Sequence, residues 1–160
     1  NGKAVSDHEY QISEELVKNF NLVTEADEES GYIYILRSKS QNPEIKSIKN
    51  LYKIGYSTTP VMERIKNAAK EPTYLMAEVE LVSEFKCYNL NAQRFEQLLD
   101  NFFAEVCLNI DVFDHKRERR MPREWFVVPL PVIQRVIEMI VSGEIVGFRY
   151  NSINENIEVR

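Results

Sequence analysis

Two tyrosines and a lysine are the first side chains of this sequence that could do chemistry. Tyr32 and Tyr34 lie two positions apart in residues 31–37, and Lys53 lies in a second segment of similar pattern, residues 51–57. A nearby ammonium group favours the phenolate form and lowers the pKa of a tyrosine, so a Tyr–Lys pair is a potential acid–base pair. The alternative is that tyrosines occur here because aromatic residues suit strands. These residues alone leave both interpretations open.

A basic and an acidic side chain in later segments add to this set. Arg64 lies next to Ile65 in residues 60–70, so we expect it at the edge of the buried face of a helix. Glu96 lies among apolar residues in a second helical pattern, residues 91–106. Its carboxylate therefore points either to solvent or into a site. Considered singly, each of these two is an ordinary surface residue of a helix.

The elements that must position these side chains begin with two strands. Residues 31–37 and 51–57 both alternate apolar and polar residues and are rich in β-branched and aromatic types, which is typical of strands. A polar connector, residues 38–50, separates them and indicates an antiparallel pair. Alternation places Tyr32 and Tyr34 on the same face of the sheet.

The rest of the chain adds helices and further strands. Residues 5–20 have the pattern of an amphipathic helix, and an acidic linker follows it, so residues 1–30 are interpreted as an N-terminal extension. Residues 147–160 are interpreted as a C-terminal tail, of which the Asn-rich residues 150–160 are expected to be loosely held. Between them we expect one domain, residues 31–146, with these further elements: helices at 60–70, 91–106 and 131–142, strands at 78–87 and 124–128, and an irregular or hairpin segment at 107–121.

Composition limits the class of protein. The 160 residues, 44% hydrophobic and 28% charged, suit a soluble domain with its own core. No apolar run reaches the roughly 18 residues of a membrane span, and the start at Asn1 without Met indicates a piece of a longer protein. Cys87 and Cys107 lack metal-type spacing, so we expect reduced cysteines in a cytoplasmic protein. His8 and His115 lie far apart, which argues against a histidine metal site or a Ser-His-Asp triad.

Charge is distributed unevenly along the chain. The net charge is −5, yet residues 31–70 carry 8 basic and only 2 acidic side chains. This segment, here called the basic island, includes Lys66 and Lys70. A local basic surface can hold a phosphate backbone even when the whole protein is acidic. The alternative is that these charges are scattered over solvated surface.

Taken together, the motifs resemble those of the GIY-YIG nuclease superfamily. The resemblance rests on Tyr32-Ile33-Tyr34, then Lys53-Ile54-Gly55, then Arg64 and Glu96 in that order. It is closest to a branch with a lysine in the second motif and a downstream Arg-Glu-Trp-Phe, here residues 123–126. It covers roughly residues 31–143. Tyr32 stands where the family has glycine, and Lys53 stands where it has tyrosine.

The resemblance implies an α/β (α+β) fold with a small central antiparallel sheet of about three strands flanked by helices. It also implies a DNA endonuclease that uses one divalent cation, Mg²⁺ or Mn²⁺. In that scheme Glu96 holds the metal and Arg64 binds the phosphate. Tyr34, its pKa lowered by Lys53, or Lys53 itself takes the proton of the attacking water, and Tyr32 completes the catalytic set.

The resemblance further implies DNA as a partner, together with other domains of a longer polypeptide. Arg37, Lys66, Lys70 and Arg123 are the expected DNA-binding residues. The alternative function is a catalytically inactive nucleic-acid or protein-interaction module with the same fold. A small-molecule enzyme is disfavoured because no Gly-rich phosphate loop is present. For a nuclease we expect the catalytic side chains to converge on one surface, and we expect Arg64 and Glu96 not to lie on opposite sides of the sheet.

Overall fold

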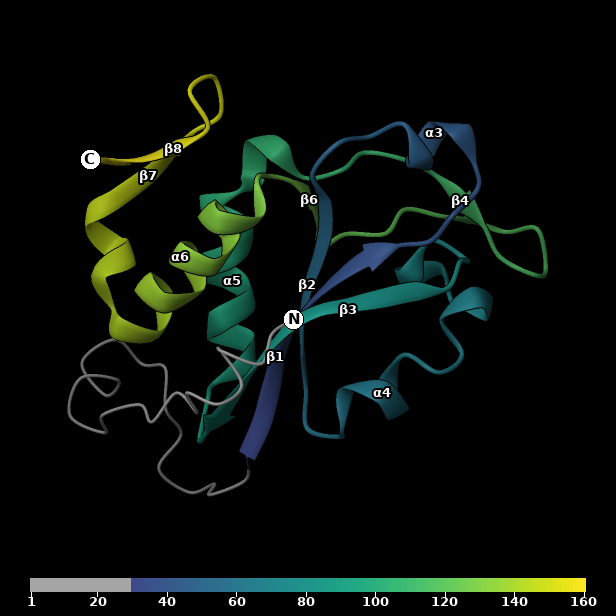
Figure 1. The fold of residues 1–160 in the computed structure, drawn as a ribbon, viewed down its shortest axis with the longest axis horizontal. Coiled ribbons are helices and arrows are strands. Elements are labelled where there is room, and N and C mark those ends of the chain that lie inside the picture. The colour runs from purple at the N-terminus through teal and green to yellow at the C-terminus, as the bar shows by residue number, and fades with distance from the viewer. Residues whose placement is uncertain (1–29) are drawn as a thin grey trace.

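The chain is described by a computed structural model that covers residues 30–160. Its centre is a four-stranded antiparallel sheet in the order β3 (Val79–Tyr88), β1 (Ser30–Ser38), β2 (Leu51–Ser57) and β6 (Trp125–Val127) (Figure 1). Helices flank this sheet, so the predicted mixed α and β fold is confirmed. The fourth strand is the short segment predicted at residues 124–128, which pairs with the edge of β2. The helix predicted at 5–20 and its acidic linker lie outside the described residues.

The register of the sheet determines which side chains share a face. Tyr34 lies opposite Gly55 in the β1–β2 pair, and Leu36 lies opposite Lys53. On the other side of β1, Tyr34 lies opposite Glu84 in β3. Because side chains alternate along each strand, Tyr34 and Lys53 project from the same face.

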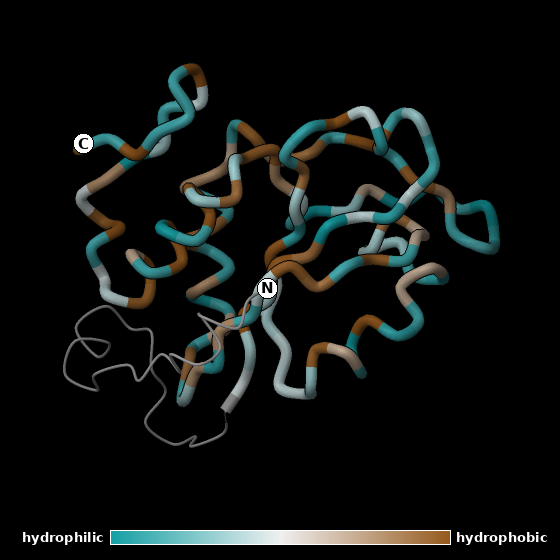
Figure 2. Tube along the Cα trace, in the orientation of Figure 1, coloured by the Kyte–Doolittle hydropathy of each residue, from teal (hydrophilic) through white to brown (hydrophobic). Residues whose placement is uncertain are grey.

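The two faces of the sheet have different coverings. On one face, α5 (Ala92–Phe102) and α6 (Leu130–Ser142) pack against Ile33, Ile35 and Phe85 in the main hydrophobic core. The other face is covered by α4 (Val61–Arg64) and the 3₁₀ turns η1 (Ala68–Lys70) and η2 (Pro72–Tyr74). Figure 1 shows α4 on the opposite side of the sheet from α5 and α6, and Figure 2 shows the hydrophobic stretches of the central strands between them.

Two helices are shorter than the sequence predicted, whereas the helix expected at 131–142 forms as α6. The helix expected at 60–70 stops at Arg64, and η1 and η2 carry the chain on toward β3. The helix expected at 91–106 divides into α5 and η3 (Ala104–Val106). A short helix, α3 (Pro43–Lys46), lies in the polar connector, where Asn42 caps it. Pro72 offers no N–H for a continuing helix, which explains the break before η2.

Residues 107–121 contain the hairpin that the sequence allowed. Its strands are β4 (Val112–Phe113) and β5 (Arg119–Arg120). Asp114 accepts hydrogen bonds from the backbone N–H groups of Lys116 and Glu118, which fixes the turn. Val112 packs with Ile45 and Trp125, so the hairpin is attached to the α3 segment and to the sheet edge.

The C-terminal residues are not a loose tail, contrary to the sequence prediction. After η4 (Glu144–Gly147) the chain forms a hairpin of β7 (Phe148–Asn151) and β8 (Asn156–Val159). Tyr150 is buried, and its ring centroid lies 5.2 Å from that of Phe103. Tyr150, with Phe148 and Ile157 packed against the same core, therefore holds a segment whose composition had suggested looseness.

Two expectations from composition concern the described part of the chain. Within residues 30–160, no helix is long and apolar enough to cross a membrane. Cys87 is buried and Cys107 is half-buried, and both are free thiols.

Candidate active site

A buried lysine is the centre of the candidate site. The Lys53 side chain is only 1% exposed, and its Nζ donates to Glu124 Oε1 at 2.9 Å and to Thr73 Oγ1 at 3.0 Å. The ammonium also lies over the ring of Tyr74, 5.3 Å from the centroid. Burial lowers the pKa of Lys53, and the charge of Glu124 opposes this shift. Keeping Lys53 charged at this buried position therefore carries a desolvation penalty, which its polar partners offset.

The wall around Lys53 comes from the start of β6 and from η2. Trp125, fully buried, pairs with Lys53 in the sheet register, and its Nε1 donates to the carbonyl oxygen of Thr73 at 2.9 Å. Glu124 has φ of 75°, a left-handed conformation that is rare for residues other than glycine. Its carbonyl accepts the N–H of Ile54 at 3.1 Å. A strained backbone thus aims the Glu124 carboxylate at the lysine.

Tyr34 packs tightly over a glycine of the neighbouring strand. A Cβ atom added at Gly55 would lie 2.4 Å from Tyr34 Oη, so only glycine leaves room for the phenol ring there. Burial raises the pKa of Tyr34, the neighbouring Tyr74 raises it further, and Arg64 opposes the shift. The expectation that Lys53 lowers the pKa of Tyr34 is wrong. Desolvation of the phenolate outweighs the nearby cation.

Tyr74 lies between the two cationic groups of the site. The Arg64 guanidinium is 5.3 Å from the Tyr74 ring centroid, the same distance as the Lys53 ammonium. Tyr74 Oη is buried and makes no regular hydrogen bond in the described part of the chain, although Tyr34 and Tyr74 shift the pKa of each other. Arg64 forms an ion pair with Glu71 at 3.4 Å and remains 40% exposed. Of the two cations around Tyr74, Arg64 is therefore the one that solvent or a phosphate can reach, whereas Lys53 is buried.

Glu96 approaches Lys53 from the other side of the sheet. Helix α5, which carries it, packs on the face opposite α4, so the helices of Arg64 and Glu96 do lie on opposite faces. The charges of both residues nevertheless act on the Lys53 ammonium, Arg64 lowering its pKa and Glu96 raising it. Lys53 is next to the end of β6, where Glu124 also lies. The expectation that Arg64 and Glu96 would not lie on opposite sides of the sheet is therefore wrong. What the two residues share is the effect of their charges on Lys53 at the β2–β6 edge.

Glu96 and Glu124 are the side chains here that suit a divalent cation. Burial raises the pKa of the half-buried Glu96, and the charges of Glu124 and Asp100 raise it further. A cation would relieve this repulsion. Within residues 30–160 no cluster of three or more His, Cys, Asp or Glu side chains forms a metal cage. The donor set fits a hard ion such as Mg²⁺, which is often held by one or two carboxylates and several waters.

The other predicted site residues lie at differing distances from Lys53. Tyr32 lines a separate surface pocket on the same face as Tyr34. Arg37 lies on the opposite face, over the ring of Tyr52, and pairs with Glu80 at 3.3 Å. Arg123 precedes Glu124 and its charge reaches Asp100, so it borders the carboxylates. Catalytic or DNA-binding roles for these residues stay predictions.

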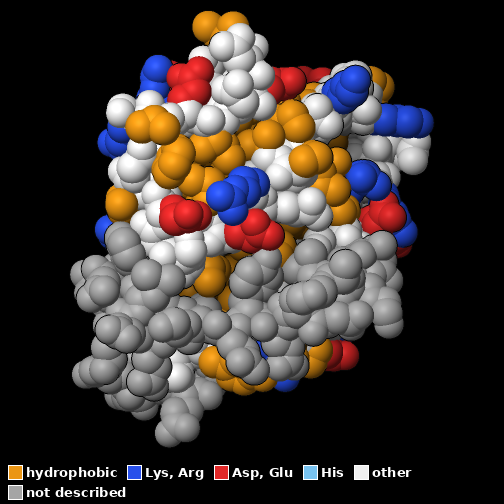
Figure 3. Space-filling model, turned by 60° about the vertical axis from the view of Figure 1, so that its left-hand side comes forward, with side chains coloured by type: hydrophobic (Ala, Val, Ile, Leu, Met, Phe, Trp, Pro, Cys, Tyr) orange, Lys and Arg blue, Asp and Glu red, His pale blue; other side chains and the backbone are white. Residues whose placement is uncertain are grey.

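The basic island does not form one continuous basic face. Lys66 pairs with Glu63 at 3.1 Å, while Lys70 is exposed in η1. Four of the eight basic side chains of the island form ion pairs with carboxylates, namely Arg37, Lys53, Arg64 and Lys66. On the face shown in Figure 3, the described basic side chains are interspersed with acidic and hydrophobic ones. A DNA surface would therefore need contributions from outside the island.

The sequence did not reveal three residues of the site. Glu124 belonged to the Arg-Glu-Trp-Phe motif, but the motif served only as a mark of resemblance and gave no role to its carboxylate. Thr73 and Tyr74 follow the Glu71-Pro72 break, where no periodic pattern indicates a direction for a side chain. The one available signal was Lys53 itself, because a charged side chain within a strand pattern needs polar partners if it is buried.

Comparison with known proteins gives one family and one relative. Residues 31–141 match the T5orf172 domain, a nuclease-like, DNA-interacting domain family. The chain is 41% identical over 140 residues to the uncharacterized protein YeeC of Bacillus subtilis (strain 168), an alignment covering 88% of this chain and 35% of that relative. The chain thus spans about a third of the length of this relative. No solved structure matches.

The family match corrects the resemblance drawn from the motifs. The matching family is the T5orf172 domain, and no match to the GIY-YIG family supports the earlier assignment. The reason lies in the motifs themselves, which are three-residue strand segments rich in Tyr, Ile and Gly. Such segments are favoured by β-structure in general and discriminate poorly between families.

Proposed function

Because this chain belongs to the T5orf172 domain family, we propose that it is a metal-dependent DNA endonuclease domain that hydrolyses phosphodiester bonds with one divalent cation. The observation that carries the proposal is the buried Lys53 ammonium, held by Glu124 and acted on by the charges of both Arg64 and Glu96. Buried, perturbed ionisable groups of this kind cluster at functional sites. The family supplies DNA as the substrate class.

In this proposal the chain's own residues bind the phosphate and move the proton. Arg64, the exposed cation, binds a phosphate oxygen and stabilises the charge that develops there. In its neutral amine form, which burial favours by lowering its pKa, Lys53 takes the proton of the attacking water and becomes the ammonium that Glu124 holds. Between the two bases left open by the sequence, the pKa directions favour Lys53. Tyr34 stays protonated and acts as a hydrogen-bond donor.

Glu96, whose pKa is raised by burial and by the charge of Glu124, is the proposed holder of Mg²⁺ or Mn²⁺. When bound, such an ion would supply positive charge to the scissile phosphate. Glu124 also keeps Lys53 in place through its 2.9 Å ion pair. We propose that other parts of a longer polypeptide select the target, since the chain spans about a third of its relative.

The test is nicking of supercoiled plasmid by the purified chain with Mg²⁺ or Mn²⁺, and with EDTA as the metal-free arm. Glu96→Gln keeps the side-chain shape but removes its charge, so we expect cleavage to be lost. Glu105→Gln is the matched control, because Glu105 is exposed in η3. We expect it to cleave as the parent does. Equal cleavage by parent and Glu96→Gln would overturn the proposed metal site.

A second candidate function is a DNA-binding module without catalysis. The observation that favours it is the enclosure of Lys53 and Tyr34, neither of which solvent reaches readily. The ion pair between Arg64 and Glu71 also reduces the free charge of the site. Duplex binding by the parent chain without nicking, in either metal, would favour this second function.

A further inference from the structure

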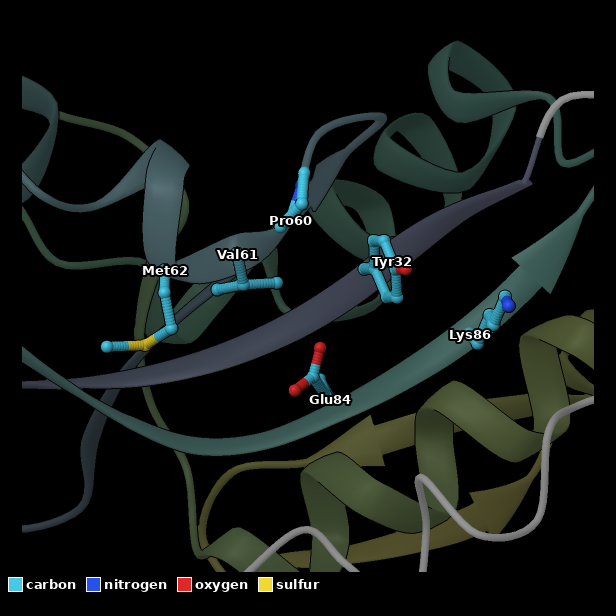
Figure 4. A pocket seen from close by; sticks show the side chains of 6 residues that line it. All are labelled: Tyr32, Pro60, Val61, Met62, Glu84 and Lys86. Carbon is cyan, nitrogen blue, oxygen red and sulfur yellow. The ribbon is translucent and has the colours of Figure 1, made fainter.

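A pocket beside the candidate active site has no role in the proposed hydrolysis. Its lining residues are Tyr32, Pro60, Val61, Met62, Glu84 and Lys86, and its volume is about 290 Å³ (Figure 4). Tyr32 is two residues before Tyr34 on the same face, and Val61 and Met62 belong to α4, which ends at Arg64. The pocket is therefore adjacent to the proposed phosphate contact.

The walls of this pocket suit a flat, apolar-faced ligand. The half-buried Tyr32 ring, Pro60 and Val61 are its apolar surfaces, as Figure 4 shows. Met62 stands at the rim with 66% of its surface exposed, although the packing of α4 relies on Val61 rather than on this side chain. Its thioether is therefore available to a ligand that enters the pocket.

Glu84 gives the pocket its polar specificity. It lies opposite Tyr34 in the β1–β3 register, and its carboxylate points toward Val61 and Tyr32 (Figure 4). A carboxylate repels phosphate but accepts hydrogen bonds from amino groups on base edges, notably N4 of cytosine. Lys86, the other charged lining residue, has its ammonium over the ring of Tyr88, 5.5 Å from the centroid, so Glu84 is the charged group that favours a base over a backbone phosphate.

We propose that this pocket binds one nucleobase next to the scissile phosphate, stacked on Tyr32 and hydrogen-bonded to Glu84. The inference rests on the proposed function, because DNA is the ligand in both. A base that carries an exocyclic amino group, cytosine above all, is preferred over thymine, whose corresponding edge offers a carbonyl oxygen. The pocket thus gives the domain a base preference beside the cut, while Arg64 holds the backbone.

The experiment is fluorescence anisotropy with labelled single-stranded oligonucleotides without divalent metal. The probes are oligo-dC, oligo-dT and an abasic strand with the same number of phosphates, and a labelled duplex is included. We expect the parent to bind oligo-dC about tenfold more tightly than the abasic strand, the usual scale for one stacked base. Tyr32→Leu should remove this difference. Phe113→Leu, which changes an aromatic residue 61% exposed in β4, is the matched control and should keep it.

A second variant tests hydrogen bonding separately from stacking. Glu84→Gln introduces an amide that both donates and accepts, so we expect the preference for oligo-dC over oligo-dT to fall or reverse. Glu78→Gln, an exposed residue just before β3, should leave the preference unchanged. Equal binding of all single strands by the parent, with duplex binding intact, would overturn the base pocket alone. Absence of binding to every probe, the duplex included, would overturn the proposed function as well.

Discussion

The pair of Lys53 and Glu124 should respond very differently to removal of one partner or the other. Within residues 30–160, Glu124→Ala leaves the buried ammonium in direct contact with Thr73 Oγ1 and the Tyr74 ring, with the charge of Glu96 acting from farther away. Breaking a buried ion pair costs about 3–5 kcal/mol. Glu124 is 36% exposed, so water can enter in its place, and we expect the lower end, about 3 kcal/mol.

Lys53→Met should behave in the opposite way. Methionine fills the same space beside Tyr74 and Trp125, and the remaining Glu124 carboxylate can turn to solvent. Apolar replacement of a buried charge is often neutral or stabilising by about 1–4 kcal/mol, so we expect no loss of stability. The double variant Lys53→Met/Glu124→Ala should match Lys53→Met, which gives a coupling of about 3 kcal/mol.

Urea unfolding measures these differences, with the emission of Trp125 as a probe. Trp125 is the single tryptophan of the chain and lies against Thr73. Circular dichroism should follow the same transition, which checks that the emission reports global unfolding. A Lys53→Met variant destabilised as much as Glu124→Ala would refute the reasoning, because Lys53 would then be needed by the fold. If Lys53→Met is as stable as the parent but no longer nicks plasmid, Lys53 is needed for activity rather than for stability.

Four further outcomes are expected. Tyr34→Phe should slow plasmid cleavage by about 10²-fold, the usual loss for one hydrogen-bond donor to the transition state. The pH–rate profile should not move, because the pKa of Tyr34 is raised and its phenol is not the base. A shifted profile would contradict this. Gly55→Ala should cost about 1–3 kcal/mol in urea unfolding by displacing the Tyr34 ring, and unchanged stability would show that the ring has room. Lys70→Glu should weaken DNA binding for all sequences alike and lower the salt slope by about one unit, whereas unchanged affinity would remove the exposed Lys70 from the DNA surface. Burial raises the pKa of the Cys87 thiol to about 12, so as the pH rises the unfolded chain loses this proton before the folded chain does. The free energy of unfolding should therefore fall by about 1.4 kcal/mol per pH unit above pH 9. Cys87→Ala should show a shallower fall, and equal slopes for parent and variant would contradict this prediction.

The sequence predicted the strands well because their signal is local. Alternation in residues 31–37 and 51–57 was sufficient for β1 and β2, and both strands end within one residue of the predicted positions. Helix 60–70 was overestimated, because its apolar residues Ile65 and Ala68 pack on the sheet from a turn and the 3₁₀ segment η1 rather than from a continuous helix. The C-terminal hairpin was missed because its anchors, Tyr150 with Phe148 and Ile157, contact core residues that are distant in sequence.

The site was predictable only as a set of residue types. Lys53 was conspicuous as a charge within a strand pattern, yet nothing in the sequence indicated that its partner lies 71 positions later at Glu124. The pKa of Tyr34 was predicted with the wrong sign, because charge can be read from a sequence whereas burial follows from three-dimensional packing. The sequence identifies Glu96 and Arg64 as candidates but does not indicate which face of the sheet each of them occupies.

The segment between α4 and β3 is held to the sheet through Thr73, which accepts from Lys53 at its side chain and from Trp125 at its backbone. Both donors belong to neighbouring strands, β2 and β6. A ligand that draws the Lys53 ammonium toward itself would leave Thr73 with the Trp125 hydrogen bond, while Ala68 and Tyr74 still pack on the sheet. Amide protons of the η1–η2 turns should then exchange with solvent through local opening well below the global unfolding free energy. Ligand binding at the site would then change the hydrogen-exchange protection of this segment even if the segment does not contact the ligand.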